Sequence, residues 1–238
     1  MRSMIIDKIR QELAKVDKPE NKLDYQKFFK EKLKERYGLK TAILRKIINK
    51  CFKDVCMLPK EEILDICDNL LESDIQYGRS FAFIWAEKLK GDYSKADFNR
   101  FEKWLEKYVD NWASCDSLST GAIGNLILHF PELASKTRKW TKSKNMWFRR
   151  ASAVSLITPV SNGMLLDEVF KIAGILLCDK EDLVQKGYGW MLKVAGDEFP
   201  NEVFAYVMRN KKRMPRTALR YAIEKYPQEK KKEAMRLG

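Results

Sequence analysis

Residues 169–176 have the sequence VFKIAGIL, in which apolar side chains recur at intervals of three and four, at Val169, Ile172, Ala173 and Leu176. This spacing places the apolar side chains on one face of an α-helix. The same periodicity recurs along the chain, at Ile5, Ile9 and Leu13, at Ala42, Leu44, Ile47, Ile48 and Cys51, at Phe81, Ile84, Trp85 and Leu89, and at Ile123, Leu126 and Ile127. No segment alternates with a period of two, so we expect no β-sheet.

Short polar or Gly/Pro clusters separate these stripes, for example at Gly91-Asp92, at residues 161–163 and at Phe199-Pro200. The 238 residues include only 11 Gly and 7 Pro. The apolar stripes and the few breaks between them suggest about a dozen helices of ordinary length joined by short loops. We therefore predict an all-α protein with a single domain over residues 1–238. Its architecture would be an α-solenoid of paired helices, with the long concave face that such stacks form.

Composition excludes several other classes. With 45% hydrophobic and 33% charged residues, the chain can bury a core and is not expected to be disordered. The longest uncharged stretch, Ala151–Leu166, is too short to span a membrane and contains Pro159. The charged, amphipathic N-terminus is unlike a signal peptide, so we expect a cytoplasmic protein.

The histidine and cysteine content argues against a metal site. The five cysteines lack CxxC spacing, which favours reduced thiols. His129 is the single histidine and precedes Phe130-Pro131, where we expect a structural role at a helix end. A zinc site or a Ser-His-Asp triad is therefore not expected, and we predict neither a metal nor a cofactor.

The net charge of +13 is concentrated in two segments. Residues 136–150 contain seven bases and no acid, and residues 209–238 contain eleven bases and three acids. Such runs are commonly solvated helix faces. Here, however, Trp140, Trp147, Tyr221 and Tyr226 lie among the bases. Phosphates need charge, and bases or sugars need a flat apolar surface. The pattern favours a basic nucleic-acid groove on the concave face.

Residues 109–117, VDNWASCDS, contain the most informative carboxylate. Trp112 and Asp116 are four positions apart and would share one face of a helix. An alternative is that Asp116 or Ser117 caps a helix beginning at Leu118, with Trp112 in the core. Residue types alone favour this capping role.

The order of several motifs resembles the AlkD family of bacterial DNA alkylation-repair glycosylases, over about residues 20 to 225. The motifs are Trp112…Asp116, Pro131-Glu132-Leu133, Trp147-Phe148-Arg149-Arg150-Ala151 and Gln185-Lys186-Gly187-Tyr188-Gly189-Trp190, with further agreement at Gly38-Leu39-Lys40-Thr41 and at residues 215–221. The resemblance implies a single domain of HEAT-like helical repeats. Two features depart from the family pattern. Asp182 and Leu183 stand where aromatic residues are frequent, and Gly187 and Gly189 are expected to weaken their helix.

The resemblance also implies an activity and a site. Members of the family hydrolyse the N-glycosidic bond of N3- and N7-alkylated purines in duplex DNA, and they leave the damaged base stacked in the duplex. Carried over by position, Asp116 is the catalytic carboxylate, and Trp112 and Trp190 are aromatic walls. DNA contacts are expected at Arg150, which would bind a phosphate, and at Lys193, Tyr25, Arg149, Arg216 and Arg220. The partner would be duplex DNA containing alkylated purines, bound by a monomer. The resemblance also implies a nucleoid-associated protein of bacterial or archaeal type.

These residue types suit a cationic base. An alkylated purine is already a good leaving group, so catalysis requires support for the oxocarbenium-like sugar. A carboxylate supplies that support by charge, and each indole adds about 0.5–2 kcal/mol of cation–π attraction. A neutral base such as uracil would be a poor substrate. Two other functions remain open, a non-catalytic paralogue that binds branched or damaged DNA, and a helical scaffold for an acidic protein. We expect Trp140 and Trp147 to be core or groove-edge residues.

Overall fold

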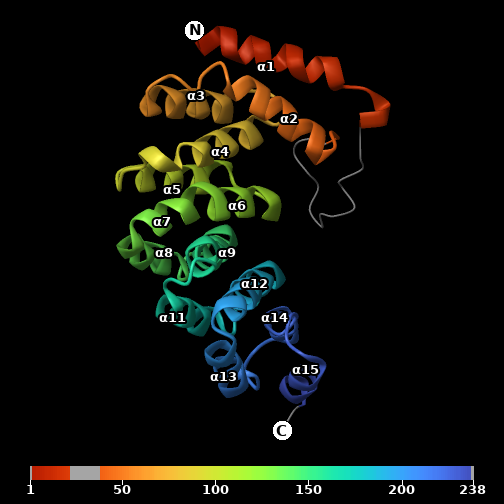
Figure 1. Cartoon of the computed structure of the whole chain (residues 1–238), viewed down its shortest axis with the longest axis vertical. Helices are drawn as coiled ribbons and strands as arrows, with labels where there is room; N and C mark the ends of the chain where they lie inside the picture. The colour runs from red at the N-terminus through yellow and green to blue at the C-terminus, as the bar shows by residue number, and fades with distance from the viewer. Residues whose placement is uncertain (1, 22–37, 237–238) are drawn as a thin grey trace. The chain divides into compact units, whose positions relative to one another are not determined.

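The computed structural model describes residues 2–21 and 38–236, and within these ranges every regular element is helical (Figure 1). The predicted all-α class is confirmed. No helix in the described ranges is long and apolar enough to cross a membrane. Tyr25 lies outside the described residues. The chain divides into two compact units, Met1–Asp92 and Tyr93–Gly238.

In its described residues the first unit contains four α-helices, with 3₁₀ turns at Pro19–Asn21 and Lys90–Asp92. Its α3 and α4 pack along each other, and this contact requires a glycine, since a Cβ atom on Gly78 would lie 2.4 Å from the Leu70 carbonyl oxygen. The preceding Tyr77 has a left-handed φ of 71°. Its hydroxyl accepts hydrogen bonds from the backbone N–H groups of Gly38 (2.9 Å) and Leu39 (2.8 Å). The helices of this unit are α1 (Arg2–Val16), α2 (Thr41–Phe52), α3 (Lys60–Glu72) and α4 (Gly78–Lys88).

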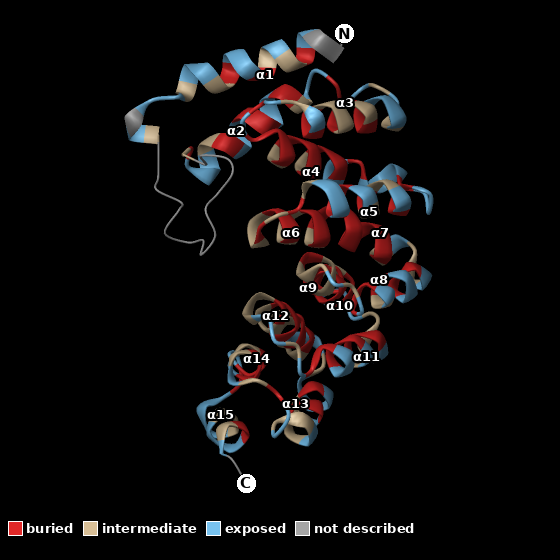
Figure 2. Ribbon diagram, turned by 180° about the vertical axis from the view of Figure 1, so that it is seen from behind, coloured by how far each residue is buried: buried red, intermediate tan, exposed pale blue. Residues whose placement is uncertain are grey.

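The second unit stacks its helices in two rows, with buried residues between the rows (Figures 1 and 2). One row contains α6, α9, α12 and α14, and the other contains α7, α8, α11 and α13. Contacts of α9 with α6 and of α12 with α9 and α14 connect the first row. The helices are α5 (Asp97–Tyr108), α6 (Trp112–Leu118), α7 (Gly124–His129), α8 (Ala134–Trp140), α9 (Met146–Val154), α10 (Ile157–Val160), α11 (Leu166–Leu176), α12 (Asp182–Glu198), α13 (Pro200–Asn210), α14 (Arg216–Ala222) and α15 (Gln228–Met235).

The two tryptophans expected to pack in the protein interior are buried. Trp140 stacks on Phe98 with ring centroids 5.4 Å apart, and its indole N–H donates to Glu102. Trp147 lies in the buried face of α9. These contacts explain the aromatic residues of the first basic segment as packing residues.

Asp116 lies inside a helix, so the capping role for it is wrong. The helix begins at Trp112, and its N-cap is Asn111, whose side-chain oxygen accepts a hydrogen bond from the Ser114 N–H at 2.9 Å. After Leu118 the chain continues through a π-helical segment, Ser119–Ile123, directly into α7. Segments of this kind are often found at functional sites.

Candidate functional site

Asp116 forms a two-point ion pair with Arg150. The Arg150 Nε atom lies 2.8 Å from Asp116 Oδ1, and Nη2 lies 2.8 Å from Oδ2. The third nitrogen, Nη1, donates to the backbone carbonyl of Leu183. These residues belong to α6, α9 and α12, so one guanidinium connects three successive helices of the first row.

The pair is largely removed from water. The Arg150 side chain is 7% exposed and the Asp116 side chain is 17% exposed. Burial raises the pKa of Asp116, and this effect exceeds the lowering by the hydrogen bond and charge of Arg150. Burial alone would lower the pKa of Arg150, but its hydrogen bond to Asp116 and the attraction between the two charges raise that pKa overall. The arginine therefore stays charged and is the main group that favours the ionised carboxylate.

The two predicted tryptophans are partly exposed on the helices that this pair connects. Trp112 is the first residue of α6, one turn before Asp116. Trp190 lies on α12, three residues after Gly187. A Cβ atom on Gly187 would lie 3.2 Å from Arg150 Cγ, so α12 packs directly against the Arg150 side chain at this point. The structure thus brings together Asp116, Arg150 and the α12 segment that leads to Trp190.

Two of the three glycines of α12, Gly187 and Gly189, are positions of close approach. The sequence predicts a weakened helix there, but α12 runs unbroken from Asp182 to Glu198. Gly187 faces Arg150, whereas a Cβ atom on Gly189 would lie 2.7 Å from Tyr221 Cβ and 2.9 Å from the Ala218 carbonyl oxygen of α14. The glycines let α12 contact both neighbours in its row. The pair of closely spaced glycines is visible in the sequence. The sequence does not distinguish glycines that permit close packing from glycines that only weaken a helix.

Gly189→Ala is expected to destabilise the protein by about 1–3 kcal/mol, because the added methyl group overlaps α14 and outweighs the better helix propensity of alanine. Gly174→Ala in α11 is the matched control, since a Cβ atom there has its nearest contact at 3.6 Å. That control is expected to be neutral or stabilising. Urea denaturation of both variants measures the difference, and equal unfolding free energies would contradict the close-approach role.

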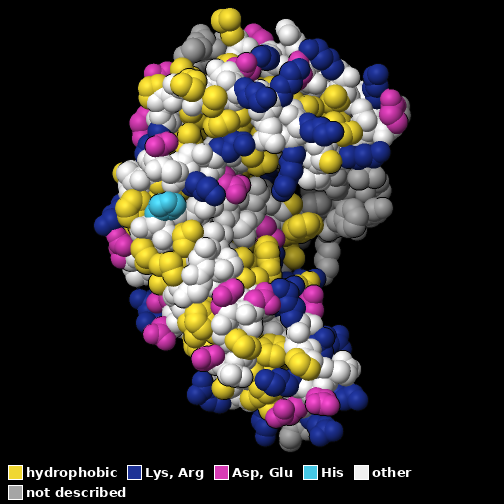
Figure 3. Space-filling model, viewed as in Figure 1, with side chains coloured by type: hydrophobic (Ala, Val, Ile, Leu, Met, Phe, Trp, Pro, Cys, Tyr) yellow, Lys and Arg dark blue, Asp and Glu magenta, His cyan; other side chains and the backbone are white. Residues whose placement is uncertain are grey.

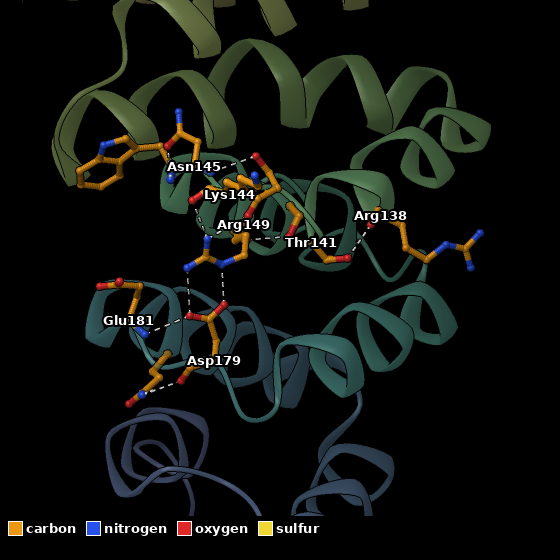
Figure 4. A network of polar contacts seen from close by, with 11 residues as sticks. Arg138, Thr141, Lys144, Asn145, Arg149, Asp179 and Glu181 are labelled. Atoms are coloured by element: carbon orange, nitrogen blue, oxygen red, sulfur yellow. Dashed lines mark hydrogen bonds and ion pairs between the residues drawn. The ribbon is translucent and has the colours of Figure 1, made fainter.

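The other predicted DNA-contacting residues lie apart from the ion pair. Lys193 Nζ is 3.0 Å from Glu224 Oε2 and 5.8 Å from the centroid of the Tyr221 ring. Arg216 and Arg220 are exposed on α14, and Arg216 donates to the Met235 carbonyl. Arg149 pairs with Asp179 (Figure 4). Among the described residues, no group of three or more His, Cys, Asp or Glu side chains could hold a metal ion.

Sequence reasoning missed a basic face on α2 of the first unit. Lys40 before the helix, Arg45 and Lys46 within it and Lys53 after it are exposed, and none has an ion-pair partner among the described residues. Basic side chains gather over α1 and α2 in the space-filling view (Figure 3). Residues 1–92 contain 20 bases and 16 acids, and the bases are spread along the segment instead of forming one run, so counting charge by segment did not reveal this face.

The fold and site define a class: an all-helical protein of stacked helices in which an arginine holds a partly exposed carboxylate. Comparison with known families is more specific. The sequence matches the profile of the DNA alkylation repair enzyme family over residues 9–226, so the chain belongs to that family. Among solved structures, it is similar to a predicted DNA alkylation repair enzyme from Enterococcus faecalis, with a TM-score of 0.70 and 17% identity over 79% of this chain and 87% of that chain. A search of curated proteins gives no match.

Proposed function

We propose that this protein is a DNA glycosylase that hydrolyses the N-glycosidic bond of cationic N3- and N7-alkylated purines in duplex DNA. The observation that supports this proposal most directly is the Asp116–Arg150 pair, in which a buried arginine orients a carboxylate that retains access to solvent. Membership of the DNA alkylation repair enzyme family supports the substrate class.

The chemistry requires no group beyond those of the chain and water. The bond between the sugar C1′ and the purine nitrogen breaks, and its electron pair leaves with the cationic base, which becomes neutral. Asp116 stabilises the positive charge that develops on the sugar, and the faces of Trp112 and Trp190 add cation–π attraction. Water then adds to C1′ and loses a proton, which leaves an abasic site.

In this proposal the main role of Arg150 is to hold Asp116. Three of its five N–H groups already bond to Asp116 and Leu183, so at most two remain for a DNA phosphate. In the second unit, contacts to the DNA backbone are then made by the more exposed bases Lys193, Arg216 and Arg220. The same bases suit a monomer that acts on DNA in the cytoplasm, as the sequence analysis predicts.

Base release from methylated DNA tests the proposal. Duplex DNA treated with a methylating agent is expected to release N7-methylguanine and N3-methyladenine when incubated with the protein, and a uracil-containing duplex is expected to release no uracil. The difference is expected because the proposed mechanism stabilises the developing cation and supplies no proton to a neutral leaving group. Chromatography of the released bases measures the outcome.

Three results would contradict the proposal. Tight binding to methylated or branched duplexes without base release would favour the non-catalytic paralogue. Failure to bind plain duplex DNA at low salt would favour a scaffold for an acidic protein, because phosphate binding is strongest at low salt. Release of uracil at a similar rate would mean that the site acts by protonating the leaving group.

A further inference from the structure

Arg149 and Arg150 are adjacent on α9 but have different partners. The Arg149 Nε atom lies 2.6 Å from Asp179 Oδ2, and Nη2 lies 3.4 Å from Oδ1. Nη1 donates to the carbonyls of Ser143 (2.9 Å) and Lys144 (3.2 Å). Four of its five N–H groups are therefore engaged within the protein, and its side chain is only 17% exposed.

Asp179 transmits this anchoring to α12. Its side chain, 9% exposed, accepts a hydrogen bond from the Glu181 N–H at 3.0 Å, and its backbone carbonyl accepts one from the Gln185 side chain at 2.8 Å (Figure 4). Glu181 is the N-cap residue of α12 and makes no side-chain capping bond. Asp179 thus supplies an acceptor that the start of this helix otherwise lacks.

The two arginines together fix the first turn of α12 from both sides. Arg149 holds the loop before the helix through Asp179, and Arg150 holds the Leu183 carbonyl within the first turn. Further along the same helix lies Trp190. Arg149, whose hydrogen bonds go to Asp179 and to the carbonyls of Ser143 and Lys144, has little left to offer a phosphate.

We propose that Arg149 is a positioning residue that fixes α12, and with it Trp190, relative to Asp116, and that it is not a DNA-contacting residue. The inference rests on the proposed function for its catalytic consequence. Its structural part, the anchoring of α12 through Asp179, stands independently.

The test uses Arg149→Gln, Asp179→Asn and the double variant of the full chain. Arg149→Gln is expected to lower base release at saturating DNA by about 10-fold or more, since small misplacements of reacting groups are costly. The slope of log K against log salt for plain duplex DNA is expected to stay unchanged, whereas loss of a phosphate contact would reduce it by about 0.9. If Arg149 acts through Asp179, the double variant loses no more than either single variant.

Arg138→Gln is the matched control. It removes the same charge and breaks an ion pair with Glu168 between α8 and α11, in the other row of helices. Base release by this variant is expected to stay near that of the parent chain. Thermal melting of each variant sets an assay temperature at which all are folded.

Amide hydrogen exchange over residues 181–187 gives a readout that does not depend on catalysis. Exchange there is expected to be faster in Arg149→Gln and Asp179→Asn but unchanged in Arg138→Gln. Unchanged protection in the first two variants would overturn the inference even if the parent chain released no base. A reduced salt slope with normal base release would also overturn it and make Arg149 a phosphate contact. Failure of the proposed function would appear in the parent chain, and failure of this inference only in the variants.

Discussion

Asp116→Asn is expected to reduce release of N7-methylguanine from methylated duplex DNA by about 10²-fold or more, the size of loss seen when one charge-stabilising group is removed. Asparagine keeps the shape of the side chain and an oxygen that can accept from Arg150, but it carries no negative charge for the developing cation. Binding to undamaged duplex is expected to be retained, because the change removes a negative charge from a protein that binds a polyanion. Single-turnover release and a binding titration measure the two effects separately.

Asp197→Asn is the control for net charge. Asp197 lies on α12 and pairs with Lys225, so the substitution removes an equal charge from the same unit without touching Arg150. It is expected to leave base release within about twofold, because surface ion pairs contribute little. Undiminished release by Asp116→Asn in a folded protein would eliminate Asp116 as the catalytic carboxylate.

Arg150→Met is expected to have the second-largest effect, on both activity and stability. Without the arginine, burial raises the pKa of Asp116 further, because the opposing interaction is lost. The acidic limb of the pH–rate profile is therefore expected to move to higher pH than in the parent chain. Release measured from mildly acidic to neutral pH reports this shift, and an unchanged limb would separate Arg150 from the ionisation of Asp116.

The same substitution is expected to lower the free energy of unfolding by about 3–5 kcal/mol at neutral pH, the cost of leaving one partner of a buried pair charged and alone. A carboxyl group with a raised pKa in the folded state costs stability above that pKa, and the cost disappears as the pH falls and the group is protonated. The deficit is therefore expected to be largest near neutral pH and to shrink on acidification. The double variant Asp116→Asn/Arg150→Met removes both charges and is expected to be more stable than Arg150→Met. The opposite order would show that the pair is not coupled.

The sequence predicts the helices and one face of the site, because these depend on local spacing. Trp112 and Asp116 lie on one face of α6 as their four-residue separation requires. The partner of Asp116 could not be predicted in this way. Arg150 is 34 positions away, and the contact exists only because α6 packs on α9.

The two neighbouring arginines are a clearer example of side-chain contacts that the sequence does not predict. Consecutive residues of an α-helix are rotated by about 100°, so Arg149 and Arg150 must face different surroundings. Nothing local indicates which of them meets Asp116 and which meets Asp179. The same holds for Gly187 and Gly189 of α12. A glycine that permits close packing of two helices and a glycine that weakens one look identical in the sequence.

The π-helical segment Ser119–Ile123 has a consequence for how this site evolves. Such a turn contains one residue more than an α-helix needs for the same rise, and it can arise by a single inserted residue. Deleting that residue would restore a regular helix and turn everything on one side of it by about 100°. Either Asp116 would swing away from Arg150, or α7 would lose its packing. The segment therefore sets the number of residues between the carboxylate and the core, and a relative with a regular α-helix here would align with a one-residue gap.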